Sequence, residues 1–259
     1  MDLGIAGRKA IVCASSRGLG RACAQALAAA GCEVVINGLD AARLEATAGE
    51  LSKATGARII PVKADVGTAE GQAALFAACP EPDILVNNNA GPPPREFRDL
   101  TRAQMLEGVT ANMVVAIELI QKAIGPMQAR RFGRIVNITS GTVKLPQAGL
   151  DLSSAARGGL TIFLAGVARQ VAASNVTINN LLPGAYETDR LKTVLGAVAK
   201  RKGTSYEDAK AERIASIPAK RLGDLEGFGA ACAFLCSAQA GFITGQNLTI
   251  DGGAFPGVF

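Results

Sequence analysis

Short apolar runs alternate along the chain with longer segments in which alanine and leucine recur at helical spacing. The short runs predict buried strands at residues 9–14, 32–37, 58–65, 83–88, 133–140, 175–183 and 247–253. The periodic segments predict helices at 18–30, 41–55, 68–78, 101–129, 152–173 and 226–237. Continuously apolar strands that alternate with helices are typical of a parallel sheet covered on both faces. We therefore expect an α/β fold with a doubly wound, Rossmann-type parallel sheet.

One segment, residues 187–217, departs from this rhythm because it is polar, helix-prone and long. It follows the sixth predicted strand, so it is expected to project beyond the carboxyl ends of the strands, where open α/β sheets bind ligands. We interpret it as an insertion that forms a substrate lid; an ordinary pair of surface helices is the alternative. No internal repeat or low-complexity linker divides the chain, which favours a single domain over residues 1–259.

Composition narrows the classes of function. The chain has 259 residues, of which 49% are hydrophobic, enough for the core of one large domain. Its formal net charge is +5, yet it has no dense Lys/Arg block and only 4% aromatic residues. These features argue against a nucleic-acid partner and favour a small anionic ligand.

Histidine and cysteine usage limits the site chemistry further. The chain has no histidine, which excludes His-ligated metal sites and His-assisted nucleophiles, and we expect no metal. None of its six cysteines has C-x-x-C spacing, so small, buried, reduced side chains are expected. No basic-then-apolar leader and no run of membrane-spanning length stand out, and we expect a cytoplasmic protein without a membrane contact.

The first predicted strand runs into the segment CASSRGLG, residues 13–20. Gly18 and Gly20 permit a tight turn and a close approach between strand and helix. The helix that starts there offers free N–H groups to a pyrophosphate. After the first strand of an alternating chain this pattern predicts a dinucleotide site, with a plain strand–helix turn as the alternative.

These segments, taken together, resemble the short-chain dehydrogenase/reductase family over essentially the whole chain. The family's Thr-Gly-x-x-x-Gly-x-Gly motif corresponds to residues 13–20, with Ala14 at the first glycine. The segments at 83–94, 133–140, 181–190 and 242–253 resemble further family motifs. The resemblance implies an NAD(P)-dependent oxidoreductase that forms a homo-oligomer, a tetramer or a dimer. It places the cofactor against Ala14, Ser16, Arg17, Gly18, Leu19, Gly20, Asp65, Val66, Asn88, Arg157, Pro183, Gly184, Tyr186 and Thr188.

The end of the second strand bears on the choice of cofactor. A carboxylate there would bind the ribose hydroxyls of NAD and repel the 2′-phosphate of NADP. The chain has Gly38 at that position, and Asp40 is expected to cap the next helix rather than to contact ribose. The resemblance implies that Arg17 contacts the 2′-phosphate, which suits its guanidinium. NADP(H) is favoured, and NAD(H) stays open.

The resemblance assigns four catalytic positions, and two of them carry unusual residues. Ser140 would orient the carbonyl, and Asn112 would support a proton-relay water. The family's tyrosine and lysine correspond to Ser153 and Arg157. An alkyl hydroxyl is a far weaker acid than a phenol, whose pKa is about 10, so Ser153 cannot match it as general acid. Arg157 can supply charge, but with a pKa above about 12 it is not expected to titrate.

Several groups could supply the proton instead. Tyr186 lies beside the expected nicotinamide position, although a packing role suits it better. Lys144 and Asp151 are close in sequence to Ser140 and Ser153. For each of them, a charged loop side chain exposed to solvent is the alternative interpretation. A water held by Ser140, Ser153 and Asn112 beside Arg157 is a further route.

The sequence thus predicts an oxidoreductase that transfers a hydride between NADP(H), or NAD(H), and a carbonyl or secondary alcohol at an altered proton-donor site. A catalytically impaired nucleotide-binding protein, a sensor or an inactive partner subunit, is the alternative. The sequence does not identify the small-molecule substrate, because it shows no charged residue that would bind one.

Overall fold

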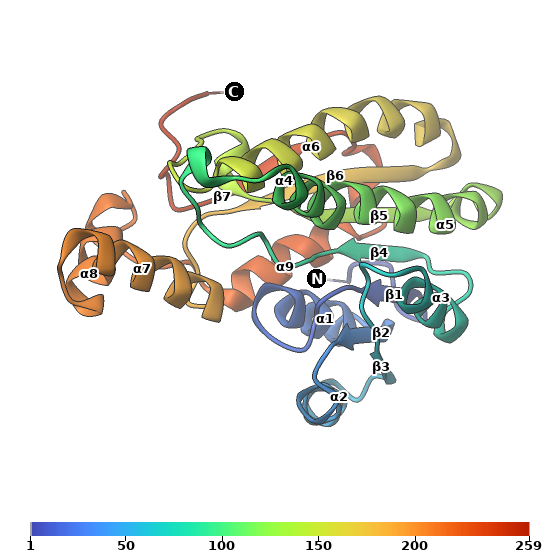
Figure 1. Cartoon of the computed structure of the whole chain (residues 1–259). Helices are drawn as coiled ribbons and strands as arrows, with labels where there is room; N and C mark the ends of the chain where they lie inside the picture. Colours follow the sequence, from blue (N-terminus) through green and yellow to red (C-terminus); the bar gives the residue numbers. More distant parts are fainter. Residues whose placement is uncertain (1, 259) are drawn as a thin grey trace.

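A single sheet of seven parallel strands organises the computed structural model, which describes residues 2–258 (Figure 1). The spatial order is β3-β2-β1-β4-β5-β6-β7, and every pairing is parallel. This confirms the predicted doubly wound α/β fold. The strands are β1 Lys9–Val12, β2 Glu33–Gly38, β3 Ile59–Lys63, β4 Ile84–Asn87, β5 Gly133–Ile138, β6 Val176–Pro183 and β7 Asn247–Ile250.

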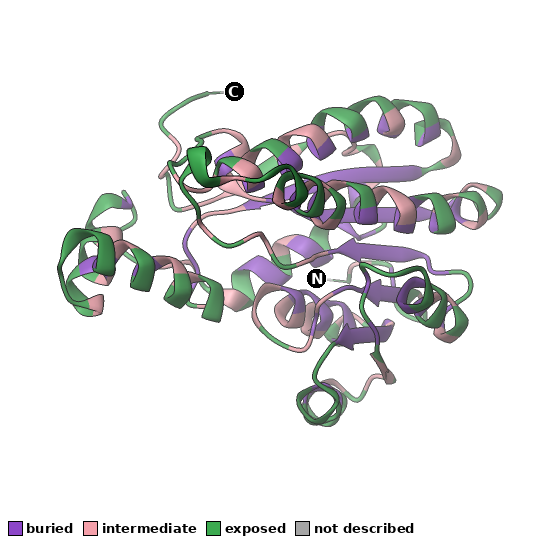
Figure 2. Ribbon diagram, viewed as in Figure 1, coloured by how far each residue is buried: buried purple, intermediate pink, exposed green. Residues whose placement is uncertain are grey.

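Helices cover both faces of the sheet, as the apolar strands require. One face packs on α1 Gly18–Ala29, α2 Ala41–Thr55 and α9 Leu225–Leu235. The other packs on α3 Ala69–Ala78, α5 Val115–Ala129 and α6 Asp151–Val171. Successive residues of β1 alternate between the two cores: Val12 packs with the first helix layer and Ile11 with the second. Figure 2 shows the strands buried between green outer helix faces.

Local capping fixes where several helices start. The carboxylate of Asp40 accepts the backbone N–H of Arg43 at 3.1 Å and so caps α2, the role predicted for it. Thr68 caps α3 in the same way. Thr101 forms a capping box with Gln104 at the start of α4, Arg102–Val109. These caps place the loops at the carboxyl edge of the sheet in defined conformations.

The predicted helix at 101–129 contains an unpredicted change of pitch. Thr110–Val114 forms a π-helical turn between α4 and α5. By length and composition alone the continuous helix Arg102–Ala129 could cross a membrane, with a mean hydropathy of 1.3 over eighteen residues. Glu118 and Lys122 interrupt its apolar residues, so no uninterrupted apolar run of that length occurs, as expected. In this fold the inner face of α5 packs on β4 and β5 as a layer helix.

The polar segment after β6 forms two helices, α7 Asp189–Lys202 and α8 Tyr206–Ser216. They pack on each other and project from the rest of the molecule (Figure 1). Their surfaces are mostly exposed (Figure 2). All six cysteines are buried free thiols, and their burial agrees with the prediction.

Candidate active site

The phosphate loop lies after β1, at the point where the winding of the sheet reverses between β1 and β4. Ala14 has φ +45°, a left-handed conformation that favours glycine. Two asparagines hold it there: its N–H donates to Asn37 Oδ1 at 2.6 Å, and its carbonyl accepts Asn88 Nδ2 at 3.2 Å. The loop therefore keeps its shape although the first glycine of the motif is absent.

The start of α1 lies so close to the preceding loop that a side chain at position 20 would collide with the loop backbone. A Cβ on Gly20 would lie 2.4 Å from the Ala14 carbonyl oxygen and 2.9 Å from Asn88 Nδ2. The N-cap residue, Arg17, makes no side-chain capping bond, so the first-turn N–H groups of α1 keep their capacity to bind an anion. This geometry fits a pyrophosphate at the helix N-terminus.

The end of β2 carries no free carboxylate. A Cβ on Gly38 would lie 2.9 Å from Ser16 Oγ, so the Ser16 hydroxyl occupies the space that an acidic side chain would need. Lys63 stands opposite Gly38 in the parallel register. Arg17 forms an exposed ion pair with Asp189 at 2.5 Å. Cations and a hydroxyl surround this edge, which fits a 2′-phosphate better than a bare ribose.

The remaining predicted cofactor contacts lie around the same edge. The exposed Asp65 carboxylate accepts the Gly67 N–H at 2.8 Å, and Val66 is buried. Leu19 is half-buried on the first turn of α1. The side chain of Thr188 reaches within 3.6 Å of a Cβ position on Gly18, so the segment after β6 lies against the phosphate loop.

The segment 183–186 lies between the loop that carries Ser140 and the core. A Cβ on Gly141, next to Ser140, would lie 3.2 Å from the Pro183 carbonyl oxygen, and Gly184 N–H donates to the Ile250 carbonyl at 2.9 Å. The phenol of Tyr186 donates to the same carbonyl at 3.2 Å and its ring packs edge-on against Phe228. Burial raises the pKa of Tyr186 to about 12. Its side chain is turned into the core, where it serves packing.

Arg157 lies in the second turn of α6 and is only 8% exposed. Its Nη1 donates to the Ile138 carbonyl at 2.7 Å and its Nη2 to the Asn89 carbonyl at 3.1 Å. Burial, and secondly the charge of Arg190, lower the pKa of Arg157 to about 10. The expected value above 12 is thus corrected downward, because no carboxylate of residues 2–258 pairs with this guanidinium.

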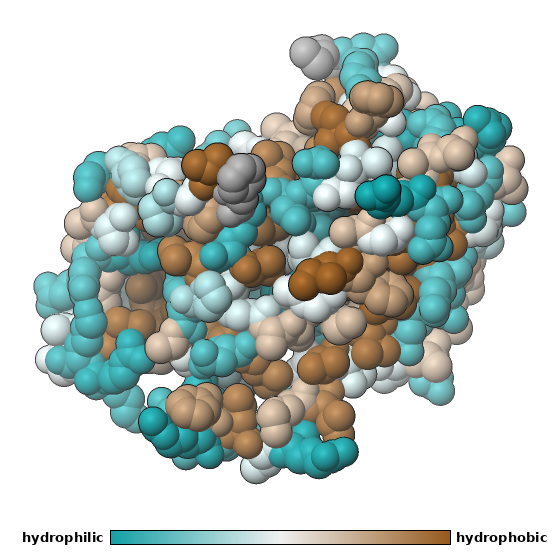
Figure 3. Space-filling view, turned by 90° about the horizontal axis from the view of Figure 1, so that it is seen from above, coloured by the Kyte–Doolittle hydropathy of each residue, from teal (hydrophilic) through white to brown (hydrophobic). Residues whose placement is uncertain are grey.

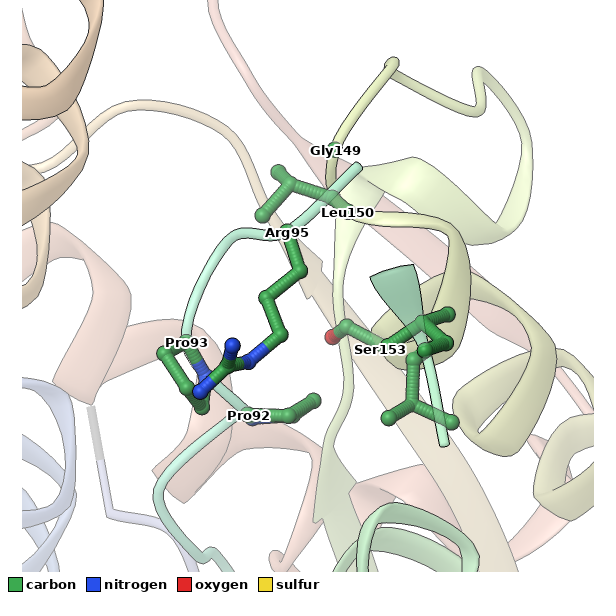
Figure 4. Close-up of a pocket in the computed structure, with 8 residues that line it drawn as sticks. Pro92, Pro93, Arg95, Gly149, Leu150 and Ser153 are labelled. Carbon is green, nitrogen blue, oxygen red and sulfur yellow. The ribbon is translucent and has the colours of Figure 1, made fainter. Parts of the chain in front are cut away.

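Ser153 precedes Arg157 by one helical turn, so both side chains share a face of α6. A Cβ on Gly91 would lie 3.6 Å from Ser153 Oγ and 3.7 Å from Arg157 Nη2. Ser153 also lines a small, open hollow together with Pro92, Arg95 and other residues. Figure 4 shows its hydroxyl directed into this hollow.

Asn112 lies within the π-helical turn and is 5% exposed. Its Nδ2 donates to the Ala90 carbonyl at 3.3 Å and to the Gly108 carbonyl at 3.4 Å. Its Oδ1 and that of Asn87 are buried without a hydrogen-bond partner among residues 2–258. Both residues, with Arg157, line a second small hollow. Two orphan acceptors beside a hollow fit an ordered water.

Ser140 follows the end of β5 by two residues at the same edge, where its Oγ accepts the Thr142 N–H at 3.1 Å and the Thr142 hydroxyl at 2.9 Å. The other two proton-donor candidates are engaged elsewhere. The Lys144 ammonium lies 5.3 Å from the ring centroid of Phe255, and Asp151 Oδ2 accepts the Gly149 N–H at 3.1 Å. Neither side chain lines the hollow beside Ser153 or the one beside Asn112.

Two arginines at the site carry no sequence signal that we recognised. Arg190 Nη2 donates to the Pro92 carbonyl at 2.8 Å, although 98 positions separate the two residues. Arg95 lines the hollow opposite Ser153 (Figure 4). Arg190 ends the family-like segment 181–190 but matches none of its motif positions, and Arg95 lies just after the segment 83–94, so only the folded chain brings them to the site.

Comparison with known proteins agrees with this geometry. Residues 13–254 match the family model described as enoyl-(acyl carrier protein) reductase. The chain is 32% identical over 256 residues to the NADPH-dependent reductase BacG of Bacillus subtilis (strain 168), covering 97% of this chain and 99% of that protein.

Solved structures give the same result. The structure of YwfH, an NADPH-dependent reductase involved in bacilysin biosynthesis, has a TM-score of 0.92 and 31% identity, covering 98% of this chain and 100% of that chain. L-sorbose reductase of Gluconobacter frateurii, complexed with NADPH and L-sorbose, has a TM-score of 0.92 and 25% identity with complete coverage of both chains.

Proposed function

The chain belongs to the short-chain dehydrogenase/reductase family, and from this premise we propose that it transfers a hydride between NADP(H) and the carbonyl or secondary alcohol of a small molecule. In the direction of reduction, the carbonyl compound, NADPH and a proton give the alcohol and NADP⁺. The observation that carries the proposal is the convergence of Arg157 and Ser153 beside Gly91, at the sheet edge that also holds the phosphate loop.

NADP(H) is proposed over NAD(H) because of the charges at the end of β2. Gly38 leaves room for Ser16, Asp40 is committed to its cap, and Arg17 can exchange the exposed carboxylate of Asp189 for a phosphate. The exchange costs little, since exposed ion pairs contribute about 0–1 kcal/mol. The NADPH-dependent relatives support the same choice.

The residues of this chain would act around the hydride that NADPH supplies when bound. Ser140 and Ser153 offer hydroxyl donors to the carbonyl oxygen. The Arg157 cation, buried and without a carboxylate partner among the described residues, favours the negative charge that develops on that oxygen. A water at the orphan Oδ1 of Asn112 would deliver the proton, in place of a phenol.

A second candidate function rests on Ser153 itself. A serine hydroxyl at the position of the family's tyrosine gives slow proton transfer, which suits a nucleotide-binding sensor or an inactive partner subunit. This candidate requires tight cofactor binding with no turnover. It also predicts that no substrate binds in the hollow near Ser153.

The oligomeric state, compartment and lid are part of the proposal. Met105 and Leu106 on α4 and Ile162 and Phe163 on α6 are exposed apolar side chains on two helices that contact each other, which supports a homo-oligomer, a tetramer or a dimer. Figure 3 shows hydrophobic side chains among hydrophilic ones on the upper face. The free thiols support a cytoplasmic location. The projecting helix pair α7–α8 supports the proposal of a lid over the substrate.

Titration with NADPH and turnover with a carbonyl panel test the function. We expect enhanced or shifted nicotinamide fluorescence on binding, tighter for NADPH than for NADH, and loss of nicotinamide absorbance with at least one ketone, aldehyde or oxo acid. Binding without turnover across the panel would favour the sensor or partner subunit. Absence of NADPH binding by the folded protein would refute both candidates.

A further inference from the structure

Three arginines from different parts of the chain surround the proposed substrate position. A Cβ on Gly91 would lie 3.3 Å from Arg190 Nη2 as well as 3.7 Å from Arg157 Nη2. Arg95 lines the adjoining hollow opposite Ser153 (Figure 4). The three come from the β4–α4 connection, α6 and α7, so the fold, and not a local run of basic sequence, gathers them.

The nearby carboxylates do not neutralise this cluster. Within residues 2–258, none of Arg95, Arg157 and Arg190 forms an ion pair. Asp189, next to Arg190, pairs with Arg17, and Glu187 pairs with Lys210.

Two further acids stand near the hollow. Glu96, beside Arg95, pairs with Arg98, and Asp151 accepts a backbone N–H from Gly149. The arginine cluster therefore keeps an excess of positive charge where a substrate would enter. Such a concave site attracts an anion.

The positions of the donors limit where that anion lies on the substrate. Arg190 Nη2 and Ser153 Oγ both come within 4 Å of the same Gly91 point. A carbonyl oxygen bound by Ser153 and an anionic group bound by Arg190 are therefore separated by only a few bonds. Planar guanidinium groups recognise carboxylates by paired hydrogen bonds.

We propose that the substrate is a small oxo acid, whose carboxylate is bound by Arg190 and Arg95 and stands adjacent, or nearly adjacent, to the reducible carbonyl. This inference rests on the proposed function for the reaction and goes beyond it in substrate class. Arg157 would face the carbonyl end, and the two other arginines the carboxylate end. The reaction consumes an oxo acid and yields the corresponding hydroxy acid.

Pairs of substrates that differ only in whether the carboxylate is free or esterified test the inference. The test compares 4-methyl-2-oxopentanoate with its methyl ester, and acetoacetate with its methyl ester and its N-acetylcysteamine thioester. The variants are Arg190→Gln and Arg95→Gln. Lys192→Gln is the control, because it removes an exposed positive charge from the same helix without touching the cluster.

The wild-type protein should prefer an acid to its ester. Arg190→Gln should raise KM for that acid about 10- to 100-fold, the value of a charge-assisted contact, while changing KM for the ester little. Lys192→Gln should leave both unchanged. Preference for a neutral ester or the thioester, with KM for the acid insensitive to Arg190→Gln and Arg95→Gln, would overturn the oxo-acid proposal and leave hydride transfer standing.

Binding of oxamate tests the carboxylate site independently of the proposed hydride transfer. Oxamate has the carboxylate of a 2-oxo acid and an amide in place of the ketone, so it binds without being reduced. Calorimetry in the presence of NADP⁺ should show binding that Arg190→Gln weakens and Lys192→Gln does not. That result without any turnover would support the carboxylate site and refute hydride transfer, whereas equal oxamate affinity in all variants would refute the carboxylate site.

Discussion

Replacing Ser153 by tyrosine tests whether the absent phenol limits the reaction. Ser153 lies on the first turn of α6 with its hydroxyl directed into the hollow, and Arg157 Nη2 approaches the same Gly91 point at 3.7 Å. A phenol there would face a cation, which favours phenolate and lowers its pKa from about 10 toward neutrality. Positioned general acids contribute about 10²- to 10⁴-fold, so kcat at pH 7 should rise by about 100-fold.

Ser153→Phe is the matched control, because it adds the same ring without the hydroxyl. Any loss from crowding Pro92 or Arg95 is common to both variants, so the ratio of their kcat values isolates the acid. The assay follows nicotinamide absorbance under saturating NADPH, across a pH range that shows the new acid as a titrating limb. Equal kcat values for the two variants, with NADPH affinity as in the wild type, would refute the reasoning that only the acid is missing.

Adding Arg157→Lys to this variant would complete the family's pair at a cost. Arg157 donates to two carbonyls, at Ile138 and Asn89, from opposite ends of one planar group. A single ammonium is not preorganised to hold both, and a buried unpaired carbonyl costs about 1–3 kcal/mol. The double variant should therefore be less stable than Ser153→Tyr alone in urea unfolding, even where it turns over faster.

Four other outcomes follow from the geometry. Arg17→Ala should raise Kd for NADPH about 10- to 100-fold and change Kd for NADH little, measured by fluorescence titration; equal effects on both would refute a 2′-phosphate contact. Ala14→Gly should stabilise the protein by up to about 1 kcal/mol in urea unfolding, since it relieves a left-handed alanine at φ +45°; a loss of stability would contradict this. Gly20→Ala should lower the unfolding free energy of the protein by about 1–3 kcal/mol and abolish cofactor binding, because the added Cβ would meet the Ala14 carbonyl oxygen at 2.4 Å. Gly49→Ala on α2 is the control: nothing surrounds its added Cβ, so the unfolding free energy should stay the same or rise. Burial lowers the folded-state pKa of Arg157 to about 10, below its value in the unfolded chain, so its destabilising charge is fully present below pH 10 and is relieved as the pH rises above about 10. The unfolding free energy of the wild type relative to Arg157→Met should therefore rise with pH above about 10, and a flat or falling difference would refute the pKa direction.

The sequence predicted the fold because its signals are local. Strand β1 and helix α1 follow directly from an apolar run and from the two glycines behind it, and Asp40 capped α2 as its position suggested. The π-helical turn at Thr110–Val114 left no mark in the apolar period, since one change of pitch within a long apolar helix shifts few residues.

The candidate site was predictable only where residues belong to a motif. Ser140, Asn112, Ser153 and Arg157 could be placed by position relative to family segments, although their roles stay predictions. Arg190 and Arg95 could not be placed, because each reaches the site through contacts between segments far apart in sequence. The lowered pKa of Arg157 was also invisible, since it depends on burial and on Arg190.

Within the proposed function, a serine at position 153 and an arginine at position 157 are explained by one electrostatic argument. A phenol delivers a proton as the hydride arrives, so the carbonyl oxygen never carries a full charge. A serine cannot do so, and the negative charge on the oxygen must then be stabilised until water supplies the proton. A buried guanidinium that is charged at neutral pH meets that need better than an ammonium, because it stays fixed by its two carbonyl partners. A substrate that brings its own carboxylate adds a second negative charge, and Arg190 and Arg95 are the groups that would balance it.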